Sequence, residues 1–413
     1  MTHVVVIGCG VVGAAIAYEL SLVPGIKITV LDKQPPAQAA TAAALGVLMG
    51  VISHKIKGKA WQMRQASIQR YETLIPELIA LTGYQIPFNQ QGILMPLNSE
   101  SVSESDLQKW ETLAEIRKTQ GCSLEIWSRA KVKSRCPQIN CLRLKAAVYS
   151  PGDRQVDPVS LTLALVAAAK RNGVTFHFGV TAEAYDLKTT SDQHQVRRIK
   201  LNQGLDPVIP DVDWLVVSAG LGTLQALQAM LGSRGDGEQE TIVQNDSLDE
   251  KFPLCQKSSS ALGVEQILDI RPVLGQAIHL KLSHPLGNQD FQPVITANDV
   301  HIVPCGGGLQ ATEYWIGATV EFPTDTGDVV AQPALLAQVF KDAIALCPAL
   351  AQATVLRTWS GLRPRPEGRP APVIGHLPGF SNVLLATGHY RNGVLLAPAT
   401  AQLISQLILN SKF

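Results

Sequence analysis

The sequence predicts an α/β protein with two domains, and three observations support this. The chain has 413 residues, which is long for a single hydrophobic core. A β-branched run over 4–7 ends at glycine and is followed by a helical pattern over 11–22 and a strand pattern over 27–31, which together form a βαβ unit. Three strand patterns between 277 and 319 then favour a second sheet, mixed or antiparallel.

Composition and charge limit the class of partner. Hydrophobic residues make up 46% of the chain and charged residues 17%, with a formal net charge of +1. Such a surface has no strong field to attract nucleic acid or an anionic membrane. The apolar run over 39–52 falls short of the roughly 20 residues that a membrane-spanning helix needs. We therefore expect a small ligand, no nucleic-acid partner and no stable membrane insertion.

The cysteines give no sign of a metal site or of a disulfide framework. All seven are scattered along the chain, and no two of them form a Cys-x-x-Cys pair. Unpaired thiols in a chain without a signal-peptide pattern favour a reducing compartment. The expected location is the cytoplasm, and assembly into a homo-oligomer stays open.

The next part of the chain predicts an inserted unit. Residues 58–82 have the pattern of a long amphipathic helix. Strand patterns over 92–97 and 147–149 then flank a helical stretch over 106–120. This order is consistent with a second domain inserted into the first.

A capped helix and two strands follow. Asp157 precedes Pro158, and an acidic cap before a proline in the first helical position predicts a helix to Arg171. Residues 174–178 form the next strand pattern. The apolar strand over 214–220 ends in small residues, which lets backbone approach a ligand closely. This strand is expected to return to the first domain.

The later half contains a polar segment and a covering helix. Residues 233–262 are rich in Gly, Ser, Asp, Glu and Gln, which predicts a surface insertion without chemistry of its own. A helical pattern over 332–345 follows. The predicted division assigns 1–85, 150–225 and 350–413 to a Rossmann-like nucleotide-binding domain, and 86–149 and 226–349 to a substrate domain.

Two glycine-rich segments, over 8–13 and 388–393, lie at opposite ends of the chain, each where a strand pattern leads into a helix. A helix start presents unpaired backbone N–H groups and the positive end of the helix dipole. One such start can hold a pyrophosphate, and the other can face a polarised or anionic ring atom. The pair therefore indicates one long ligand.

Asp32 supports a dinucleotide. It ends the strand pattern that follows the first glycine segment, where a carboxylate can accept hydrogen bonds from a ribose. The small-residue run over 40–47 follows closely enough to lie beside the rest of the ligand. From these residues alone, NAD and FAD both remain possible. A tight turn without ligand, and a small-residue run that serves only helix packing, are the alternatives.

The C-terminal half contains Gly361-Leu362-Arg363-Pro364, Pro372-Val373-Ile374-Gly375 and a block from Gly388 to Pro398. These segments resemble the flavin-dependent D-amino-acid oxidase superfamily and, within it, the glycine oxidases. The resemblance extends over nearly the whole chain, because the N-terminal glycine segment, 152–158, 216–220 and 271–275 also follow in family order. It implies FAD as the cofactor. The helix beginning near Asn392 would then point its N-terminus at the flavin and stabilise negative charge on the reduced ring. No cysteine lies between Arg363 and Gly375, so the FAD is predicted to be noncovalent.

The resemblance and the glycine segments together give a set of expected FAD contacts. Thr181, after the strand ending at Phe178, is expected to place its backbone nearest the adenine, although an ordinary strand residue could stand there. The expected contacts are Gly8, Gly10, Val11, Val12, Gly13, Asp32, Lys33, Ala40, Thr41, Ala42, Leu45, Gly46, Val47, Thr181, Ala219, Gly220, Gly388, His389, Tyr390, Arg391, Asn392, Gly393, Val394 and Leu395.

Four residues are expected at the substrate. Arg363 offers a planar fork to a carboxylate, its alternative being a surface salt bridge. Arg391 resembles a second pocket arginine, or else holds loop carbonyls. His301 stands where glycine oxidases can carry a tyrosine, and a structural histidine is the alternative. Val320 is either a pocket wall or core.

The resemblance implies oxidative deamination of glycine, sarcosine or a small D-amino acid such as D-alanine. The imine is hydrolysed to the oxo acid, dioxygen becomes hydrogen peroxide, and the product supports formation of the thiamine thiazole. Amine oxidation by a flavin needs no protein base once the amine is neutral, so no catalytic side chain is assigned. Two alternatives stay open, namely a quinone-linked D-amino-acid dehydrogenase of the same fold and a flavin-binding module without turnover.

Overall fold

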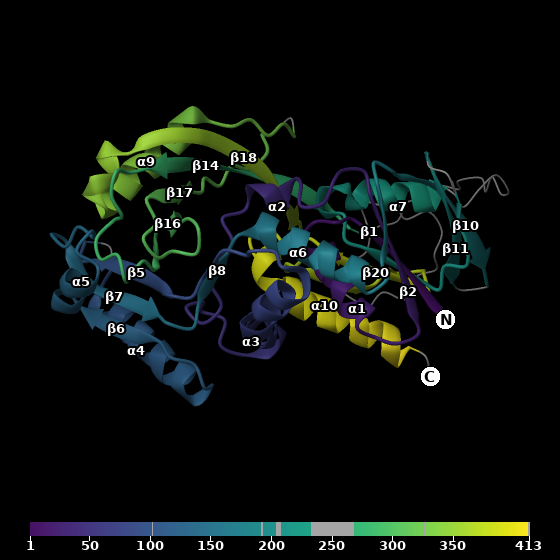
Figure 1. The fold of residues 1–413 in the computed structure, drawn as a ribbon, viewed down its shortest axis with the longest axis horizontal. Helices are drawn as coiled ribbons and strands as arrows, with labels where there is room; N and C mark the ends of the chain where they lie inside the picture. The colour runs from purple at the N-terminus through teal and green to yellow at the C-terminus, as the bar shows by residue number, and fades with distance from the viewer. Residues whose placement is uncertain (101, 191–192, 204–207, 233–267, 325–326, 412–413) are drawn as a thin grey trace, which may run out of the picture.

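The computed structural model describes residues 1–100, 102–190, 193–203, 208–232, 268–324 and 327–411. Two lobes lie along the long axis of the molecule, and both termini lie at the same end (Figure 1). The polar segment expected over 233–262 lies outside the described residues. Each lobe is built around one large sheet.

The first lobe contains a six-stranded sheet that includes the predicted βαβ unit. Its strands are parallel except for the antiparallel edge strand β19. In spatial order they are β19 (Val373–His376), β20 (Val383–Thr387), β13 (Trp214–Val217), β1 (Thr2–Ile7), β2 (Ile26–Asp32) and β9 (Thr175–Phe178). The sheet thus gathers strands from both ends of the sequence, as a discontinuous domain requires.

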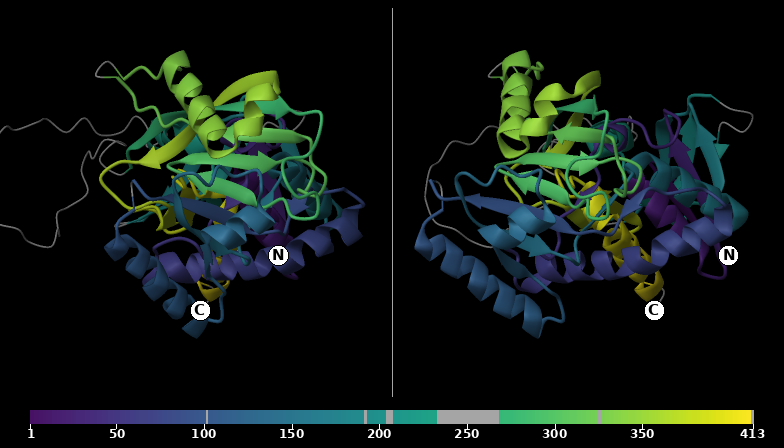
Figure 2. Two further views of the ribbon diagram at one scale, coloured as in Figure 1. Left: turned by 90° about the vertical axis from the view of Figure 1, so that its left-hand side faces the viewer. Right: turned by 60° about the vertical axis from the view of Figure 1, so that its left-hand side comes forward.

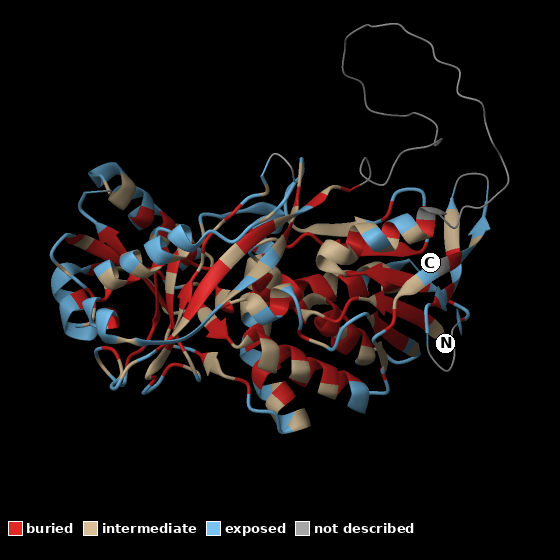
Figure 3. Cartoon of the chain, turned by 90° about the horizontal axis from the view of Figure 1, so that it is seen from above, coloured by how far each residue is buried: buried red, intermediate tan, exposed pale blue. Residues whose placement is uncertain are grey.

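Successive side chains along these strands point to opposite faces of the sheet and pack against two different layers. Val4 and Val6 of β1 pack with helices on one face, whereas Val5 packs on the other face. Figure 3 shows that most of this sheet is buried. The helical layer consists of α1 (Val11–Ser21), α3 (Gly58–Thr82), α6 (Pro158–Arg171) and α10 (Gly393–Asn410). The other layer contains α7 (Thr223–Gly232) and a small sheet of β10 (Ala182–Thr189), β11 (His194–Leu201) and β12 (Val208–Ile209).

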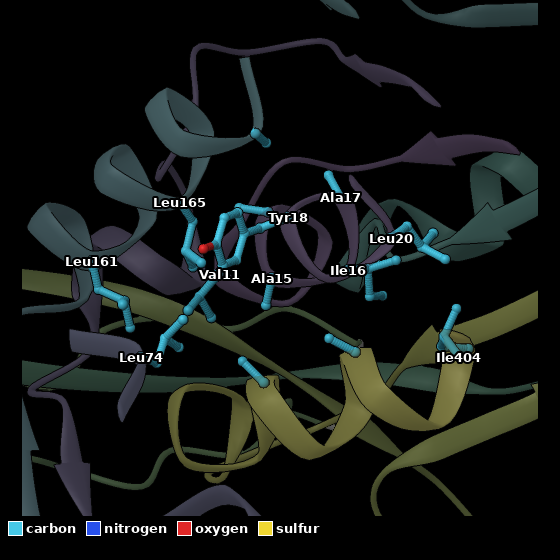
Figure 4. Close-up of a cluster of buried hydrophobic side chains, with 14 of the residues drawn as sticks. Val11, Ala15, Ile16, Ala17, Tyr18, Leu20, Leu74, Leu161, Leu165 and Ile404 are labelled. Atoms are coloured by element: carbon cyan, nitrogen blue, oxygen red, sulfur yellow. The ribbon is translucent and has the colours of Figure 1, made fainter. Parts of the chain in front are cut away.

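Helices α1 and α10 share an apolar interface at the centre of this lobe. Ala15, Ile16 and Leu20 of α1 belong to the same buried cluster as Ile404 of α10 (Figure 4). Helix α6 starts as predicted, because the Asp157 carboxylate accepts the Ser160 N–H at 2.7 Å. Among the described helices, α10 alone has the length and apolar composition of a membrane span, and 61% of it is buried inside the protein.

The second lobe contains an eight-stranded mixed sheet. In spatial order its strands are β18 (Thr354–Pro366), β14 (Ile270–Lys281), β17 (Glu313–Gly317), β16 (Val300–Pro304), β15 (Val294–Ala297), β5 (Ile93–Asn98), β7 (Leu144–Ser150) and β6 (Glu125–Ser128). Helix α9 (Pro333–Leu346) covers its outer face (Figure 2). Helices α4 (Glu104–Thr119) and α5 (Arg129–Arg135) pack near β6 and β7. The predicted α/β class with a mixed second sheet is confirmed.

Strand β18 connects the two lobes. It lies within the range 350–413 that was assigned to the nucleotide-binding domain, yet it pairs with β14 from Pro366 opposite Ile270 to Thr354 opposite Lys281. The domain boundaries stay predictions. A separate small sheet contains β3 (Val47–Leu48), β8 (Arg154–Val156) and β4 (Phe88–Asn89). In the sequence, its strands stand between strands of the two large sheets.

Candidate functional site

The turn between β1 and α1 needs its glycines for close packing. A Cβ on Gly8 would lie 2.6 Å from the Ser218 carbonyl oxygen, and one on Gly13 would overlap the Gly8 carbonyl. Gly8 also has a φ of 102°, which other residues rarely adopt. The Ser218 hydroxyl donates to the carbonyls of Ile7 and Gly8, so the end of β13 holds the turn in place. Sequence reasoning missed this serine, although it belongs to the small-residue end of that strand.

The N-terminus of α1 has donors available for an anion. The helix's own hydrogen bonding begins with the Ala14 N–H, which donates to the Gly10 carbonyl at 2.9 Å. The N–H groups of Val12 and Gly13 precede this bond and therefore have no acceptor within the helix. The Val11 N–H donates to the Thr41 hydroxyl at 3.0 Å. This places Thr41, from helix α2 (Ala40–Ala43), beside the predicted pyrophosphate site.

Asp32 lies at the end of β2, as predicted, and its carboxylate is tied to the same turn. One oxygen accepts the Cys9 N–H at 2.6 Å and the other accepts the Gln34 N–H at 2.9 Å. Each oxygen keeps a lone pair for a further donor, such as a ribose hydroxyl. Lys33 is exposed.

Thr181 follows the end of β9 at the same edge of the sheet. Its backbone N–H donates to the Asn202 side chain at 2.9 Å, and its carbonyl accepts the Asn202 N–H at 3.0 Å. The two backbone groups that would meet an adenine thus already have partners, and the Thr181 contact stays a prediction. Val180, the preceding residue, is buried and donates its N–H to the Asp32 carbonyl.

The second glycine segment forms the N-terminus of α10. Gly388 and Tyr390 have φ values of 63° and 53°, and the Leu396 N–H makes the first intrahelical bond, to Asn392. The amides of the first turn, over 393–395, therefore precede intrahelical pairing. The His389 side chain does not join them, since its Nε2 lies 3.0 Å from the Thr400 hydroxyl inside the protein.

The inner face of the eight-stranded sheet, defined here as the face that carries Gly275, Gly317 and Gly361, packs on the small-residue run of the first lobe. A Cβ on Gly361 would overlap Ala43, and one on Gly317 would lie 3.1 Å from Leu45. The Trp359 indole N–H donates to the Ala43 carbonyl at 3.1 Å. This face is therefore the wall opposite the run predicted to line the flavin.

Arg363 lies on this inner face. Residues directly opposite in neighbouring strands share a face, which places Arg363 together with Val273. The guanidinium extends across the bare backbone of Gly275, where any Cβ would overlap it. Its Nη1 donates to the carbonyls of Leu274 and Thr319, both at 3.1 Å. Among the described residues, its Nε and Nη2 have no protein acceptor.

Arg391 and His301 lie near Arg363 but belong to other elements. Arg391 precedes α10, and its Nη2 lies 2.7 Å from the Asp299 carboxylate in the turn between β15 and β16. His301 is on β16, opposite Gly317 on the inner face, and its Nδ1 lies 2.8 Å from the Thr296 hydroxyl. Arg391 thus pairs with an acidic side chain, and Asp299 is a residue that sequence reasoning missed.

The charges of these side chains act on one another. Burial, and then the Arg391 charge, lower the pKa of Arg363. Burial lowers the pKa of His301 to about 4, and both arginines contribute, so this imidazole is neutral at physiological pH. The hydrogen bond from Arg391 lowers the pKa of Asp299. The cluster therefore contains two cations, one anion and one neutral imidazole.

Val320 is half-buried, directly after the Thr319 carbonyl that accepts from Arg363. Its role as a pocket wall stays a prediction. Ala219 and Gly220 follow β13, and a Cβ on Gly220 would lie 3.8 Å from Pro364. The structure thus brings the ends of β13 and β18 together beside Arg363. This contact was not visible in the sequence because the two strands belong to different sheets.

Two buried charges fix the loop after the small-residue run. The Asp153 carboxylate accepts the N–H groups of Gly50, Val51 and Ile52 at 2.7 to 2.8 Å. Arg117, with no exposed surface, donates to three carbonyls of the same loop and lies over the Trp61 ring. These three N–H groups and three carbonyls of the loop thus have partners within the protein.

The residues present fit a flavin dinucleotide. The close-packed glycines and free amides of α1 suit a pyrophosphate, Asp32 suits a ribose, and the amides of α10 suit the polar edge of a ring. The small-residue run, which contacts the inner face at Ala43 and Leu45, would border the rest of the dinucleotide.

Comparison with known proteins agrees with this geometry. The model of the family described as FAD dependent oxidoreductase matches residues 3–244 and 256–407. The bifunctional protein ThiO/ThiG of Trichormus variabilis is 28% identical over 416 residues, covering 99% of this chain and 53% of the relative. The glycine oxidase of Geobacillus kaustophilus is 27% identical over 418 residues, covering 99% of this chain and 94% of the relative. The chain spans about half the length of the bifunctional relative.

A solved structure gives the same result for the fold. The crystal structure of glycine oxidase from Bacillus cereus superposes with a TM-score of 0.76 at 22% identity, covering 100% of this chain and 96% of that one. The resemblance predicted from the glycine-rich segments is confirmed, and FAD is the cofactor of the matched family. With a glycine turn between β1 and α1 and a family match over most of its length, this chain belongs to the FAD dependent oxidoreductase family.

Proposed function

We propose that this chain catalyses FAD-dependent oxidative deamination of glycine or of another small amine or D-amino acid, such as sarcosine or D-alanine. Arg363 carries the proposal, because its Nε and Nη2 remain available on the inner face, opposite the run that would line the flavin. A guanidinium with free donors at this place suits a substrate carboxylate. When bound, FAD accepts the two electrons that leave the amine as it becomes an imine.

In this proposal the protein binds and orients the amine. Arg363 holds the carboxylate, and its backbone bonds to Leu274 and Thr319 fix the direction of the fork. His301 is neutral and His389 is turned away toward Thr400. We therefore assign no proton transfer to a side chain. Water hydrolyses the imine to the oxo acid after the oxidation.

The acceptor, the biological role and the attachment of FAD are also part of the proposal. Dioxygen would be reduced to hydrogen peroxide, and the product would serve formation of the thiamine thiazole in the cytoplasm, consistent with a relative named ThiO/ThiG. The FAD would be noncovalent. Acid precipitation should then release it to the supernatant, whereas flavin in the protein pellet would contradict this part.

A substrate panel tests the proposal. Glycine, sarcosine, D-alanine, D-proline and the L-isomers are each mixed with the FAD-loaded protein, first without oxygen and then in air. We expect at least one of these amines to bleach the flavin anaerobically and to release peroxide in air. Bleaching without peroxide would favour a quinone-linked dehydrogenase. A flavin that none of these amines bleaches would overturn the proposed activity and favour a binding module.

A further inference from the structure

Asp299 lies at the tip of a tight hairpin, and the turn fixes its position. Ala297 of β15 pairs with Val300 of β16, which leaves Asn298 and Asp299 as a two-residue turn. Their φ values are 48° and 66°, as in type I′ turns, where Asn, Asp and Gly are strongly preferred. The carboxylate therefore projects from a rigid part of the large sheet and not from a loose loop.

The Asp299 carboxylate neutralises Arg391 across the two lobes. Their 2.7 Å ion pair joins the hairpin of the eight-stranded sheet to the segment that begins α10. The Arg391 side chain is 35% exposed and the Asp299 side chain 63%, so solvent and ligands reach the pair. A ligand carboxylate that needed Arg391 would have to displace Asp299.

Arg363 forms no ion pair with any described residue, although the Asp299 and Glu321 carboxylates lie near enough for their charges to act on it. Its contacts are backbone carbonyls, and the neutral His301 shares its sheet face. Glu321, two residues beyond Thr319, is already committed to Gln276, Gln332 and Thr319. The site thus has two guanidinium groups, of which one is neutralised and one is open to an anion.

We propose that Asp299 sets the specificity of the site, by neutralising Arg391 so that amines with one carboxylate are accepted and amines with two are disfavoured. This inference rests on the proposed function. A second carboxylate would meet the Asp299 charge directly and would lose an ionic partner that Arg391 could otherwise provide. Without the Asp299 charge, the same arginine becomes a second anion site.

The matched pair of amines for the test is sarcosine and iminodiacetate, since iminodiacetate is sarcosine with one added carboxylate. The variant is Asp299→Asn, because asparagine keeps the turn that positive φ values require. We expect the ratio of kcat/KM for iminodiacetate to that for sarcosine to rise about tenfold, the size of one gained charge-assisted hydrogen bond. An unchanged ratio would overturn the proposal.

Two further variants distinguish an effect of the Asp299–Arg391 ion pair from an effect of the protein's overall charge. Asp290→Asn removes the same charge from an exposed residue in the loop before β15, and we expect the ratio to stay at its wild-type value. Adding Arg391→Gln to Asp299→Asn should abolish the gain, because the freed guanidinium is then missing. A gain that also appears in Asp290→Asn, or that survives Arg391→Gln, would contradict the role of the pair.

Binding of non-oxidisable acids gives a readout without turnover. Dissociation constants of acetate and malonate for the FAD-loaded protein are measured by calorimetry, and Asp299→Asn should improve malonate binding about tenfold relative to acetate. If neither amine is oxidised, this binding ratio still decides the role of Asp299, and the substrate panel decides the proposed activity separately. If the amines are oxidised and neither ratio changes, the proposed activity stands and the specificity proposal is wrong.

Discussion

The guanidinium of Arg363 lies over Gly275, in space that a side chain on that residue would occupy. The two residues belong to neighbouring strands, β18 and β14, and their relation depends on the register that places Arg363 opposite Val273 and Gly361 opposite Gly275. A residue without a side chain lets the arginine lie flat and reach the Thr319 carbonyl. Substrate binding should therefore be sensitive to Gly275, although this glycine has no group that contacts a ligand carboxylate.

Gly275→Ala tests this relation. The added methyl group must displace the guanidinium, so we expect KM for the preferred amine to rise roughly tenfold or more, the loss of about one charge-assisted hydrogen bond. FAD content and the thermal unfolding temperature should stay close to wild type. Steady-state kinetics with a matched flavin-content measurement check this, and an unchanged KM would show that Arg363 does not need its observed position.

Thr41 should contribute to FAD affinity. Its hydroxyl accepts the Val11 N–H at the start of α1, and the same group can donate to a phosphate oxygen there. Thr41→Val keeps the shape and removes the hydroxyl, so we expect FAD to bind about tenfold more weakly, whereas Thr41→Ser should stay within about threefold of wild type. Titration of the apoprotein with FAD measures both variants. Equal losses in the two would point to packing and not to the hydroxyl.

His389 should make the fold sensitive to acid. Burial lowers its pKa to about 4, whereas an unfolded histidine has a pKa of about 6.5. Between these values the unfolded chain binds a proton that the folded chain does not, so stability falls as pH decreases from about 6.5 to about 4. This histidine can account for up to roughly 3 kcal/mol of that loss.

The matched variant is His389→Gln, which has no group that titrates in this range. Denaturant unfolding at several pH values between 4 and 7 should show a shallower decline for the variant than for wild type. Half-buried His301 also has a lowered pKa of about 4, so some decline should remain in the variant. Parallel stability curves for variant and wild type would mean that His389 does not carry this pH dependence.

Much of the fold could be predicted because its signals are local. The strand, glycine turn and helix at the N-terminus follow one another directly in the sequence, and Asp157 caps its helix within four residues. Register between distant strands leaves no comparable local signal. The pairing of β18 with β14, which moves residues 354–366 into the large sheet, therefore became visible only in three dimensions.

The difference between local signals and long-range contacts also explains which site residues could be predicted. Arg363 and the glycine segments belong to contiguous motifs and were predicted, whereas their immediate partners were not. Gly275, Ser218 and Asp299 act through residues far away in sequence. Asp299 had one usable signal, since Asn-Asp between two strand patterns favours a two-residue turn. Its partner Arg391 could not be identified from that turn.

The central claim is that Arg363 holds the carboxylate of an amine that reduces the bound flavin. The most direct test is anaerobic mixing of the FAD-loaded protein with the amine that the substrate panel selects, monitored by loss of the flavin's visible absorbance. We predict that wild type is bleached, that Arg363→Ala requires roughly 100-fold more amine for the same rate with FAD retained, and that Arg363→Lys lies between them. An Arg363→Ala protein that is bleached at the wild-type amine concentration would contradict the account.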